Sequence, residues 1–447
     1  MRTARCKQKR YVGLDIHKEL AVSCIVNAVG KVVHRQRCGC TREELERFGR
    51  RYLHPTDKVA LEATTNTWKV VAILKPFVAE VVVSNPLKTR AIAEAKIKTD
   101  KVDAEVLAQL LRCDFLPRVW EPPAETQRLR HLTARRATLV MDKTAIKNRI
   151  HAVLHQRLIQ CPVKDVFSVQ GRQWLSTLSL DREGRVVIDS DLRLLESVEA
   201  ELAAQEQQLA EAAYAEPQVK LLMTLPGVSI IVAQTLWAVL GDIGRFRDGD
   251  HAASYLGLVP STHQSGKHRY HGPITKQGHR QARSLLVQAA HQAVAHPGPL
   301  GAFFRRVAKR RGYNVAVVAM ARKLVVIAWH MLKTNEPYRY ASPQTVEYKL
   351  EQLRVTATGE RRKRGYAAGT PRPATYGSGQ RLRRVRSLRQ VCERAALPLP
   401  KAVDQLPAGE VRMLEGHGTL AFVQEIQQEK VKVQRVKKQQ PGCECHS

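Results

Sequence analysis

The sequence has few acidic residues for its length, and this shortage is its first informative feature. Its 447 residues include 41 Asp and Glu against 73 Lys and Arg, which leaves a formal net charge of +32. A compact protein with such an excess of positive charge repels itself unless it binds a polyanion. Nucleic acid is the usual polyanion, so we expect DNA or RNA as the partner.

Long apolar runs and a paired set of cysteines are also missing. No stretch reaches the roughly 18 uninterrupted apolar residues that a membrane-spanning helix needs, which argues against a membrane partner. The N-terminal "MRTARCKQKRYVGLD" runs into an expected strand without the apolar core of a signal peptide. The nine cysteines are odd in number and scattered. These features predict a reduced, cytoplasmic protein.

The first part of the chain has the pattern of an α/β domain. Three short apolar segments suggest a meander, and Thr41 with Glu44 forms a capping box at the start of a helix. Strands and helices then alternate. The expected order is strands 11–16, 21–27 and 31–37, helix 41–53, strand 58–63, helix 64–78, strand 79–85 and a helix beginning near 100. This order predicts an RNase H-like fold, a mixed sheet with helices on its faces.

Four carboxylates stand at informative places in that order. Asp15 interrupts the first apolar strand, Glu62 ends the fourth strand, and Asp100 and Asp103 are three residues apart at the start of a helix. In this fold the first and fourth strands are expected to be central neighbours, with the helix start beside their ends. Residues three apart on a helix point the same way, so all four acids are expected to converge.

Each acid also has a simpler interpretation. Asp100 as the N-cap and Asp103 at the third helical position would stabilise the helix without a metal. Glu62 alone fits a surface residue at a strand end. Asp15 is harder to explain, because a carboxylate in an apolar strand is costly unless it is paired or coordinated.

The combination favours a metal site. Converging carboxylates repel one another by about 4 kcal/mol per pair at ~4 Å and an effective dielectric constant near 20. A divalent cation removes that penalty, and hard oxygen ligands suit Mg²⁺ or Mn²⁺. Two such ions can stabilise the attacking and leaving oxygens of a phosphodiester. We therefore predict a magnesium site made by Asp15, Glu62, Asp100 and Asp103.

These strings resemble a known family. "GLDIHKE", "LEATTNTW" and "KIKTDKVDAEVLAQLL" are similar to the RuvC-like domain of DEDD insertion-sequence transposases, a group that includes Piv-type DNA invertases and bridge-RNA-guided recombinases. The resemblance implies that the family's four catalytic acids fall on Asp15, Glu62, Asp100 and Asp103. One local difference is that Thr65 and Trp68 follow the glutamate, where the family often has glycine and then an aromatic residue.

The middle of the chain changes to long helical patterns. Residues 124–158 carry apolar residues at helical intervals with a basic remainder, and residues 191–215 form an acidic, alanine-rich pattern. The two fit an antiparallel hairpin or a coiled-coil surface. The basic face is either simply solvated or contacts phosphates without reading sequence. The candidate phosphate contacts on it are Arg135, Arg136, Lys143, Lys147 and Arg149.

The next part contains two candidate nucleic-acid elements. Residues 221–246 read as helix, Leu-Pro-Gly-Val turn, helix, which resembles a helix-hairpin-helix whose turn amides hold a backbone phosphate. Residues 255–293 pass through a glycine-, histidine- and lysine-rich loop. A serine on such a loop is either a nucleophile, with cations stabilising the attacked phosphate, or part of an ordinary turn. Lys267 and Lys276 are the candidate cations.

The family resemblance extends to this loop. "GLVPSTHQSGKHRYHGPITKQGHRQARSLL" is similar to the C-terminal transposase domain of the same family, which implies that Ser265 is a nucleophile forming a phosphoserine link to DNA. Gln264 stands where the family often has a second serine, and Ser261 is a lesser candidate. The resemblance spans roughly residues 10–340. It also implies a bacterial, nucleoid-associated protein with a structured guide RNA and a dimer or tetramer.

We expect four segments in all: a RuvC-like domain at 10–117, a helical linker domain at 118–215, a transposase domain at 216–342 and a basic, disordered tail at 343–447. The tail is rich in Arg, Gly and Pro, which favours disorder or folding on nucleic acid. Cys443, Cys445 and His446 lack a fourth ligand, so we assign them no metal.

The sequence thus predicts a transposase or site-specific DNA recombinase that uses magnesium and Ser265. Two other functions remain open: a junction nuclease using the same acids with water as nucleophile, and a non-catalytic nucleic-acid-binding protein.

Overall fold

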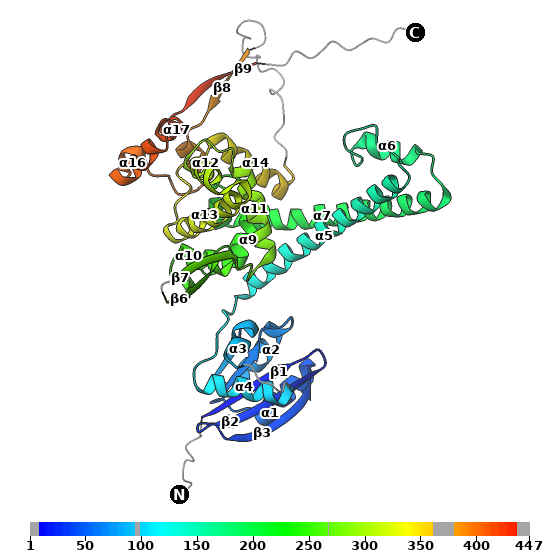
Figure 1. The fold of residues 1–447 in the computed structure, drawn as a ribbon, viewed down its shortest axis with the longest axis vertical. Helices are drawn as coiled ribbons and strands as arrows, with labels where there is room; N and C mark the ends of the chain where they lie inside the picture. The colour runs from blue at the N-terminus through cyan, green and yellow to red at the C-terminus, as the bar shows by residue number, and fades with distance from the viewer. Residues whose placement is uncertain (1–8, 94–98, 267, 361–379, 436–447) are drawn as a thin grey trace. The chain divides into compact units, whose positions relative to one another are not determined.

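The structure, a computed structural model, describes residues 9–93, 99–266, 268–360 and 380–435 (Figure 1). The chain divides into two compact units, Met1–Pro123 and Ala124–Ser447. The first boundary lies close to the predicted one at 117, whereas the predicted boundary at 215 does not separate compact units.

The first unit is built on a mixed five-stranded sheet. Its strands are β1 (Arg10–Ile16), β2 (Leu20–Asn27), β3 (Val32–Gly39), β4 (Lys58–Glu62) and β5 (Glu80–Ser84), in the order β3-β2-β1-β4-β5. β1 pairs with β2 antiparallel and with β4 parallel, and β4 pairs with β5 parallel. The predicted meander and the central pair of first and fourth strands are confirmed.

Helices cover both faces of this sheet. They are α1 (Arg42–Tyr52), α2 (Thr67–Leu74), α3 (Pro86–Ile92) and α4 (Asp100–Arg112). Val12 and Leu14 of β1 pack in the same core as α1 and α2, whereas Ala104 and Ala108 of α4 pack on the opposite face. Because strand side chains alternate between faces, Gly13 and Asp15 face α4.

Two helix starts differ from the prediction. The expected order has no helix between strand 79–85 and residue 100, but Pro86 opens α3, where Asn85 caps the helix by accepting a hydrogen bond from the Lys88 backbone N–H. Proline suits the first helical turn because its missing N–H would be unpaired there in any case. At α4 the N-cap is Thr99, whose hydroxyl accepts from the Val102 backbone N–H. Asp100 is therefore not the cap.

The second unit begins with a long helical hairpin. α5 (Ala124–Gln156) and α7 (Arg182–Ala215) lie side by side in opposite directions, with the short α6 (Val169–Thr177) at their far end (Figure 1). The predicted antiparallel hairpin is confirmed. The second helix begins at Arg182, nine residues before the predicted start at 191, with Asp181 as its cap.

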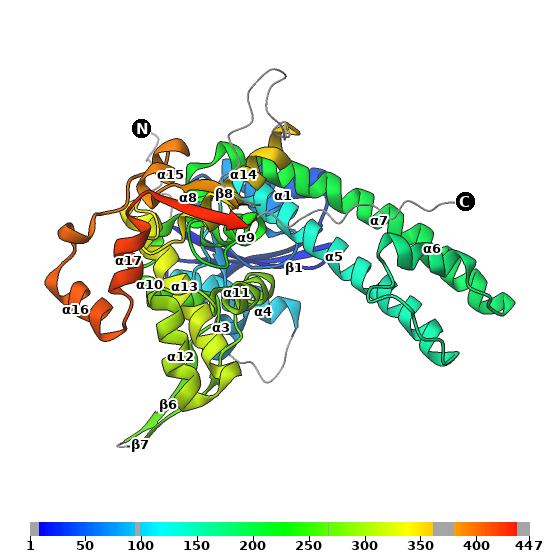
Figure 2. The same cartoon turned by 90° about the horizontal axis from the view of Figure 1, so that it is seen from above.

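A helical core follows the hairpin. Its main members are α8 (Pro217–Leu222), α9 (Ile230–Leu240), α10 (Gly249–Tyr255), α11 (Arg280–Ala293), α12 (Pro299–Arg311) and α13 (Tyr313–Thr334). β6 (Pro260–Ser265) and β7 (His268–Ile274) form an antiparallel hairpin that extends away from these helices (Figure 2). α13 is long and apolar enough to cross a membrane by length and composition, but it carries Arg322 and Lys323 and is mostly buried, as a core helix is.

The predicted disordered tail is wrong for much of its length. The described part beyond residue 342 contains α14 (Pro343–Thr358), α15 (Leu388–Arg394), α16 (Ala408–Gly416), α17 (Leu420–Ile426) and the paired strands β8 (Gln380–Val385) and β9 (Lys430–Arg435). Leu353, Val391, Leu414 and Val423 are buried in the helical core. The prediction of disorder rested on the Arg-, Gly- and Pro-rich composition, which does not show these few scattered apolar residues. Cys443, Cys445 and His446 lie outside the described residues.

Candidate functional site

The sheet brings the predicted acids of the first unit to one edge of one face. Leu14 of β1 pairs with Leu61 of β4 in parallel register, so Asp15 and Glu62 follow as neighbours at the strands' carboxyl ends. Ala60 packs on the α4 face of the sheet, and Glu62, two residues later, faces the same way. Asp100 and Asp103 lie in the first turn of α4 on that face.

His17 joins two of these acids. Its Nε2 lies 3.1 Å from an Asp15 carboxylate oxygen and 3.4 Å from an Asp100 carboxylate oxygen. One ligand atom from each of the three residues lies within 4.8 Å of the others, a spacing that could hold a metal ion. Sequence reasoning missed His17. Its signal was the Asp-x-His spacing at the end of β1, which places both side chains toward one face.

The surroundings of Asp15 disfavour the ionised form of its carboxyl group. Partial burial raises the pKa of its carboxyl group; His17 lowers it, but Asp103 and Asp100 raise it further by charge repulsion, and the net shift is upward. This electrostatic coupling places Asp103 in the same cluster as Asp15. A raised carboxyl pKa near other carboxylates is the signature expected of a site that binds cations.

The first turn of α4 presents Asp100 and Asp103 to the cluster without using either carboxylate as the helix cap. Thr99 satisfies the helix end, so neither Asp100 nor Asp103 is needed as the cap. Gly13 of β1 lets α4 approach closely, since a Cβ there would lie 1.9 Å from the Ala104 carbonyl oxygen. Close packing of α4 on β1 therefore fixes the acids of the helix over the end of the strand.

The donor set fits a divalent cation. Asp15 and Asp100 supply carboxylate oxygens and His17 supplies an imidazole nitrogen, with Asp103 close enough to perturb Asp15. Hard oxygen donors suit Mg²⁺ or Mn²⁺, and an added imidazole is the better match to Mn²⁺. The chemistry of these side chains is thus compatible with the predicted cofactor.

The predicted nucleophile lies in the second unit, at the tip of the β6–β7 hairpin. Ser265 is exposed, ends β6 and pairs with His268 across the turn. Gly266 follows with φ +56°, a left-handed conformation suited to glycine, and no described residue other than its chain neighbours lies within 4 Å of where its Cβ would be. The serine therefore stands on an open tip. His263 and Tyr270 stack behind it with ring centroids 4.8 Å apart.

The alternative serine is engaged inside the hairpin. The Ser261 hydroxyl donates to the Pro273 carbonyl oxygen at 3.3 Å, and a Cβ on Gly272 would lie 2.5 Å from it. Ser261 thus helps to hold β6 against β7. This contact favours Ser265 as the serine that can meet a substrate.

Three basic residues of α5 are paired with acids of α7. Arg136 binds Glu206, Lys143 binds Glu199 at 2.9 Å and Arg149 binds Asp191 at 2.6 Å. Their charges therefore join the two helices, and their predicted phosphate contacts stay a prediction. The acidic pattern of residues 191–215 was the unused signal for this pairing.

The other predicted cations differ among themselves. Lys147 lies over the Phe167 ring with its Nζ 4.4 Å from the centroid. Arg135 and Lys276 are exposed. Lys267 lies outside the described residues. Arg135 and Lys276 thus remain candidates for phosphate contact.

The helix-hairpin-helix-like turn has an unexpected partner. Lys349 of α14 donates to the carbonyl oxygens of Leu225 and Val228 at 2.7 and 3.0 Å. Burial lowers the pKa of this lysine to about 7. Gly227 has φ +75° and packs against the Ala289 backbone. Lys349, in the tail segment that was expected to be disordered, thus holds the turn in place through these two hydrogen bonds.

Comparison with known proteins gives two family matches, of which the first runs from the first unit through α5 and the second lies within the second unit. Residues 12–158 match a family of DEDD transposases of the IS110 type, described as "Transposase", and residues 219–305 match the "Transposase IS116/IS110/IS902 family".

Individual relatives agree with these matches. The transposase for insertion sequence element IS1111A of Coxiella burnetii is 25% identical over 343 residues, 74% of this chain and 92% of its own length. Putative transposase y4qE of Sinorhizobium fredii is 30% identical over 52% of this chain and 55% of its own length. The pilin gene-inverting protein of Moraxella lacunata is 25% identical over 74% of this chain and 98% of its own length. The chain therefore belongs to the IS116/IS110/IS902 family of transposases, and it is an enzyme of DNA strand cleavage and transfer.

Proposed function

We propose that the protein moves an insertion sequence by cutting and rejoining DNA with two sets of groups. Asp15, Glu62, Asp100 and Asp103 hold divalent magnesium, and Ser265 is the nucleophile. The observation that carries the proposal is the approach of Asp15, His17 and Asp100 to within 4.8 Å, with the pKa of Asp15 raised.

The sheet topology supports an RNase H-like assignment for the first unit. A central β1 lies between an antiparallel β2 and a parallel β4, and acids end both central strands. A divalent ion bound there would offset negative charge on the oxygens of a phosphodiester. The protein's own residues would hold the carboxylates that bind this ion in place. α4 fixes Asp100 and Asp103, while His17 positions the carboxylates of Asp15 and Asp100.

The proposed strand transfer consists of two transesterification steps, each of which forms one phosphate ester bond and breaks another, so it needs no outside energy source. The Ser265 hydroxyl oxygen bonds to phosphorus as one phosphorus–deoxyribose oxygen bond breaks, and the serine proton ends on the departing hydroxyl. A deoxyribose hydroxyl of the recipient strand then attacks the phosphoserine and returns the proton to Ser265. The exposed hairpin tip supports this role, because DNA can reach the hydroxyl there.

The acids belong to the first unit and the serine to the second. The family resemblance implies a structured guide RNA and a dimer or tetramer. The charge of +32 supports a polyanionic partner. In the second unit, the clamped Leu-Pro-Gly-Val turn is proposed as a helix-hairpin-helix-like element contacting a DNA backbone.

A second candidate uses the same acids differently. In a junction nuclease, water would replace Ser265 as nucleophile and cleaved ends would carry no protein. Among the described residues, the Ser265 hydroxyl forms no hydrogen bond to a side chain that could act as its general base. This observation favours water as the nucleophile in the alternative.

Cleavage of labelled DNA from the ends of the element tests the proposal. We expect cleavage with Mg²⁺, none with EDTA, and a loss of at least about a hundredfold for Asp15→Asn, in line with removal of a group that stabilises transition-state charge. Glu43→Gln, an exposed acid on α1, serves as the matched control and should cleave normally. Normal cleavage by Asp15→Asn would remove the carboxylates from the reaction.

A further inference from the structure

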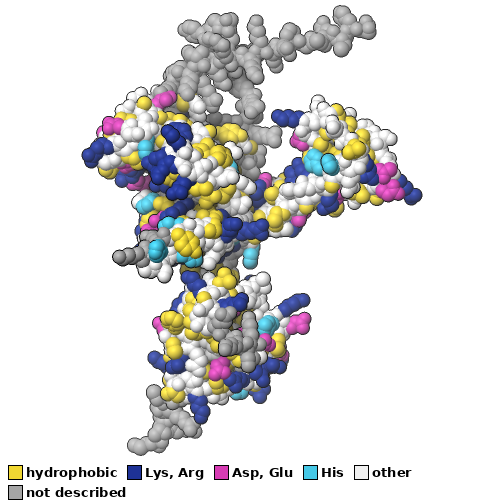
Figure 3. Space-filling view, in the orientation of Figure 1, with side chains coloured by type: hydrophobic (Ala, Val, Ile, Leu, Met, Phe, Trp, Pro, Cys, Tyr) yellow, Lys and Arg dark blue, Asp and Glu magenta, His cyan; other side chains and the backbone are white. Residues whose placement is uncertain are grey.

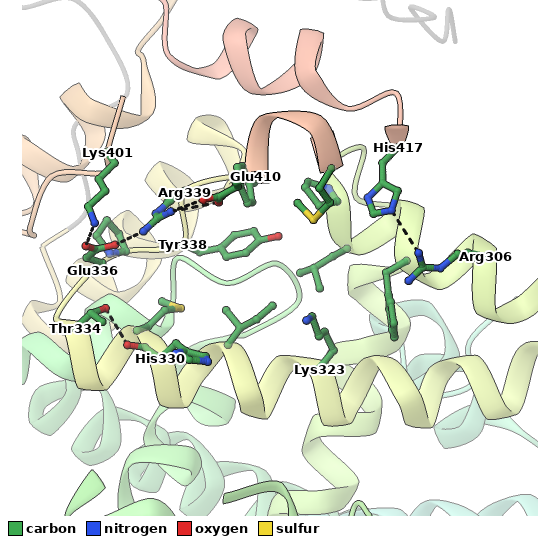
Figure 4. Close-up of a pocket in the computed structure, with 18 residues that line it drawn as sticks. Arg306, Lys323, His330, Thr334, Glu336, Tyr338, Arg339, Lys401, Glu410 and His417 are labelled. Carbon is green, nitrogen blue, oxygen red and sulfur yellow. Dashed lines mark hydrogen bonds and ion pairs between the residues drawn. The ribbon is translucent and has the colours of Figure 1, made fainter. Parts of the chain in front are cut away.

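A cavity in the second unit lies outside both proposed catalytic elements. Its volume is about 450 Å³, and its walls come from α12, α13, residues 336–340 and α16 (Figure 4). That volume falls within the range of small-ligand sites. The family match in this unit ends at residue 305, so α16 is a wall that the family region does not supply.

One side of the cavity is cationic. Lys323 points into it from α13, and Arg306 reaches it from α12, where its guanidinium lies 3.5 Å from His417 Nε2 (Figure 4). His330 adds a further nitrogen donor from α13. Lys323 forms no ion pair with a described carboxylate, so its charge is available to a ligand.

The acids of the cavity are already neutralised. Glu336 binds Arg339 at 2.8 Å and Lys401 at 2.9 Å, and Glu410 binds Arg339 at 2.9 Å and the Tyr340 hydroxyl. These pairs tie α16 to the segment that follows α13. The free charge facing a ligand is therefore positive.

The remaining wall is apolar, with one polar group. Phe303, Ile327 and Met413 line it, and the Phe303 ring lies 5.8 Å from the Arg306 guanidinium carbon. Tyr338 is only 6% exposed, and Figure 4 shows its hydroxyl aimed into the cavity. Among the described residues, no hydrogen bond of this hydroxyl is present. A buried tyrosine hydroxyl normally has a hydrogen-bond partner, so this one suits a polar ligand atom.

A row of cations leads away from the cavity along α12. The helix has no acidic residue, and Lys and Arg gather over it on the surface (Figure 3). Arg305 and Lys309 are four residues apart, as are Arg306 and Arg310, so like charges face each other and destabilise the isolated helix. Arg306 and Arg310 also line a shallow hollow next to the cavity. The row of cations therefore begins at the cavity, where Arg306 lines both hollows.

We propose that this cavity binds one unpaired nucleotide of a nucleic acid whose backbone follows α12. The base would pack against Phe303 and Met413 with a polar edge at the Tyr338 hydroxyl, and Lys323 and Arg306 would contact its phosphate. A free metabolite would not need the cation row, and a duplex would not fit a cavity of about 450 Å³. Bases out of a stack are bound in this way by aromatic side chains and cations.

This site is independent of the carboxylates and of Ser265, so it can fail while the proposed reaction stands. The nucleotide can come from RNA or from single-stranded DNA, and the same cavity chemistry serves both. The test therefore uses two probes of one sequence, each with a single 5-iodouracil, one as RNA and one as DNA.

Photo-cross-linking to the full chain, followed by peptide mapping, is the direct measurement. We expect cross-links in residues 299–306, 337–340 or 410–417. The probe that cross-links more strongly identifies the source of the nucleotide. Lys323→Ala should weaken binding about tenfold and lower the salt slope by about one, while Tyr338→Phe should weaken binding of a base but not of an abasic probe.

Lys333→Ala is the matched control, because it removes the same charge from an exposed position on the same helix outside the cavity. It should change binding less than twofold. Thermal melting checks that each variant is folded. Equal effects of Lys323→Ala and Lys333→Ala, or cross-links confined to other peptides, would overturn the proposal.

Discussion

Asp15 holds its charge at a position that the sheet partly buries. Its folded-state pKa is raised, first by burial and then by the charges of Asp103 and Asp100, against the lowering effect of His17. A raised folded-state pKa means that the ionised form disfavours folding, so this group's contribution to stability is lost as pH rises through that pKa. At neutral pH the cluster is therefore strained, and a bound cation should relieve the strain.

Magnesium should accordingly stabilise the first unit at neutral pH. At a free ion concentration tenfold above Kd, the gain is about 1.4 kcal/mol. Asp15→Asn should melt at the same temperature as the wild type or higher in EDTA, and should gain less from Mg²⁺ or Mn²⁺. Scanning calorimetry measures both shifts. Equal metal-induced shifts in wild type, Asp15→Asn and Glu43→Gln would show that the ion binds elsewhere.

At the scale of elements, the position of α4 decides whether the acids meet. Gly13 is the contact point, because a side chain there would collide with the backbone of α4 at Ala104 and Ala108. The packing of β1 against α4 thus links one glycine to the geometry of two carboxylates on the helix. Neither partner can give way easily, since both contacts are to backbone atoms.

Gly13→Ala should therefore damage both folding and activity. We expect a loss of about 3 kcal/mol in the free energy of unfolding, as for overpacking in a core, together with loss of metal binding. Gly39→Ala is the control in the same sheet, where the new Cβ would meet only the flexible Glu44 side chain at 3.2 Å. Denaturant unfolding compares the two. Near-equal stabilities would contradict the close packing of α4.

The α5–α7 hairpin depends on ion pairs of a different kind. Asp191 is 4% exposed and takes three hydrogen bonds from Arg149. Breaking this pair leaves a buried charge without its partner. We expect Arg149→Ala to cost about 2 kcal/mol and Asp191→Asn in the same chain to recover part of that loss. Urea unfolding of the single and double variants measures the coupling, and purely additive effects would contradict it.

On the scale of the whole molecule, the sequence predicted the secondary-structure elements and their order better than the contacts between residues far apart in the chain. The strand order and the long hairpin followed from apolar periodicity and from the order of elements. His17 was missed because its local signal, the Asp-x-His spacing at the end of β1, does not show that Asp100 lies beside it until the sheet and α4 are placed. The acidic pattern of residues 191–215 indicated a partner for the basic residues of α5, but the individual ion pairs depend on the register of the two helices and could not be predicted from it.

The ordered tail shows the same limit from another side. Its composition is that of a disordered segment, but a few apolar residues such as Leu353 and Leu414 enter a core made elsewhere. Lys349 then reaches a turn more than a hundred residues earlier in the chain. Composition averages over such anchors, whereas tertiary packing depends on them.

Residues of both units take part in the proposed reaction, and a covalent protein–DNA adduct tests this most directly. Full-length protein, element-end DNA and Mg²⁺ are mixed, and the adduct is measured on a denaturing gel. We predict an adduct with wild type and with Ser261→Ala, and none with Ser265→Ala or Asp15→Asn. An undiminished adduct with Ser265→Ala, or cleaved DNA ends that carry no protein, would contradict the account.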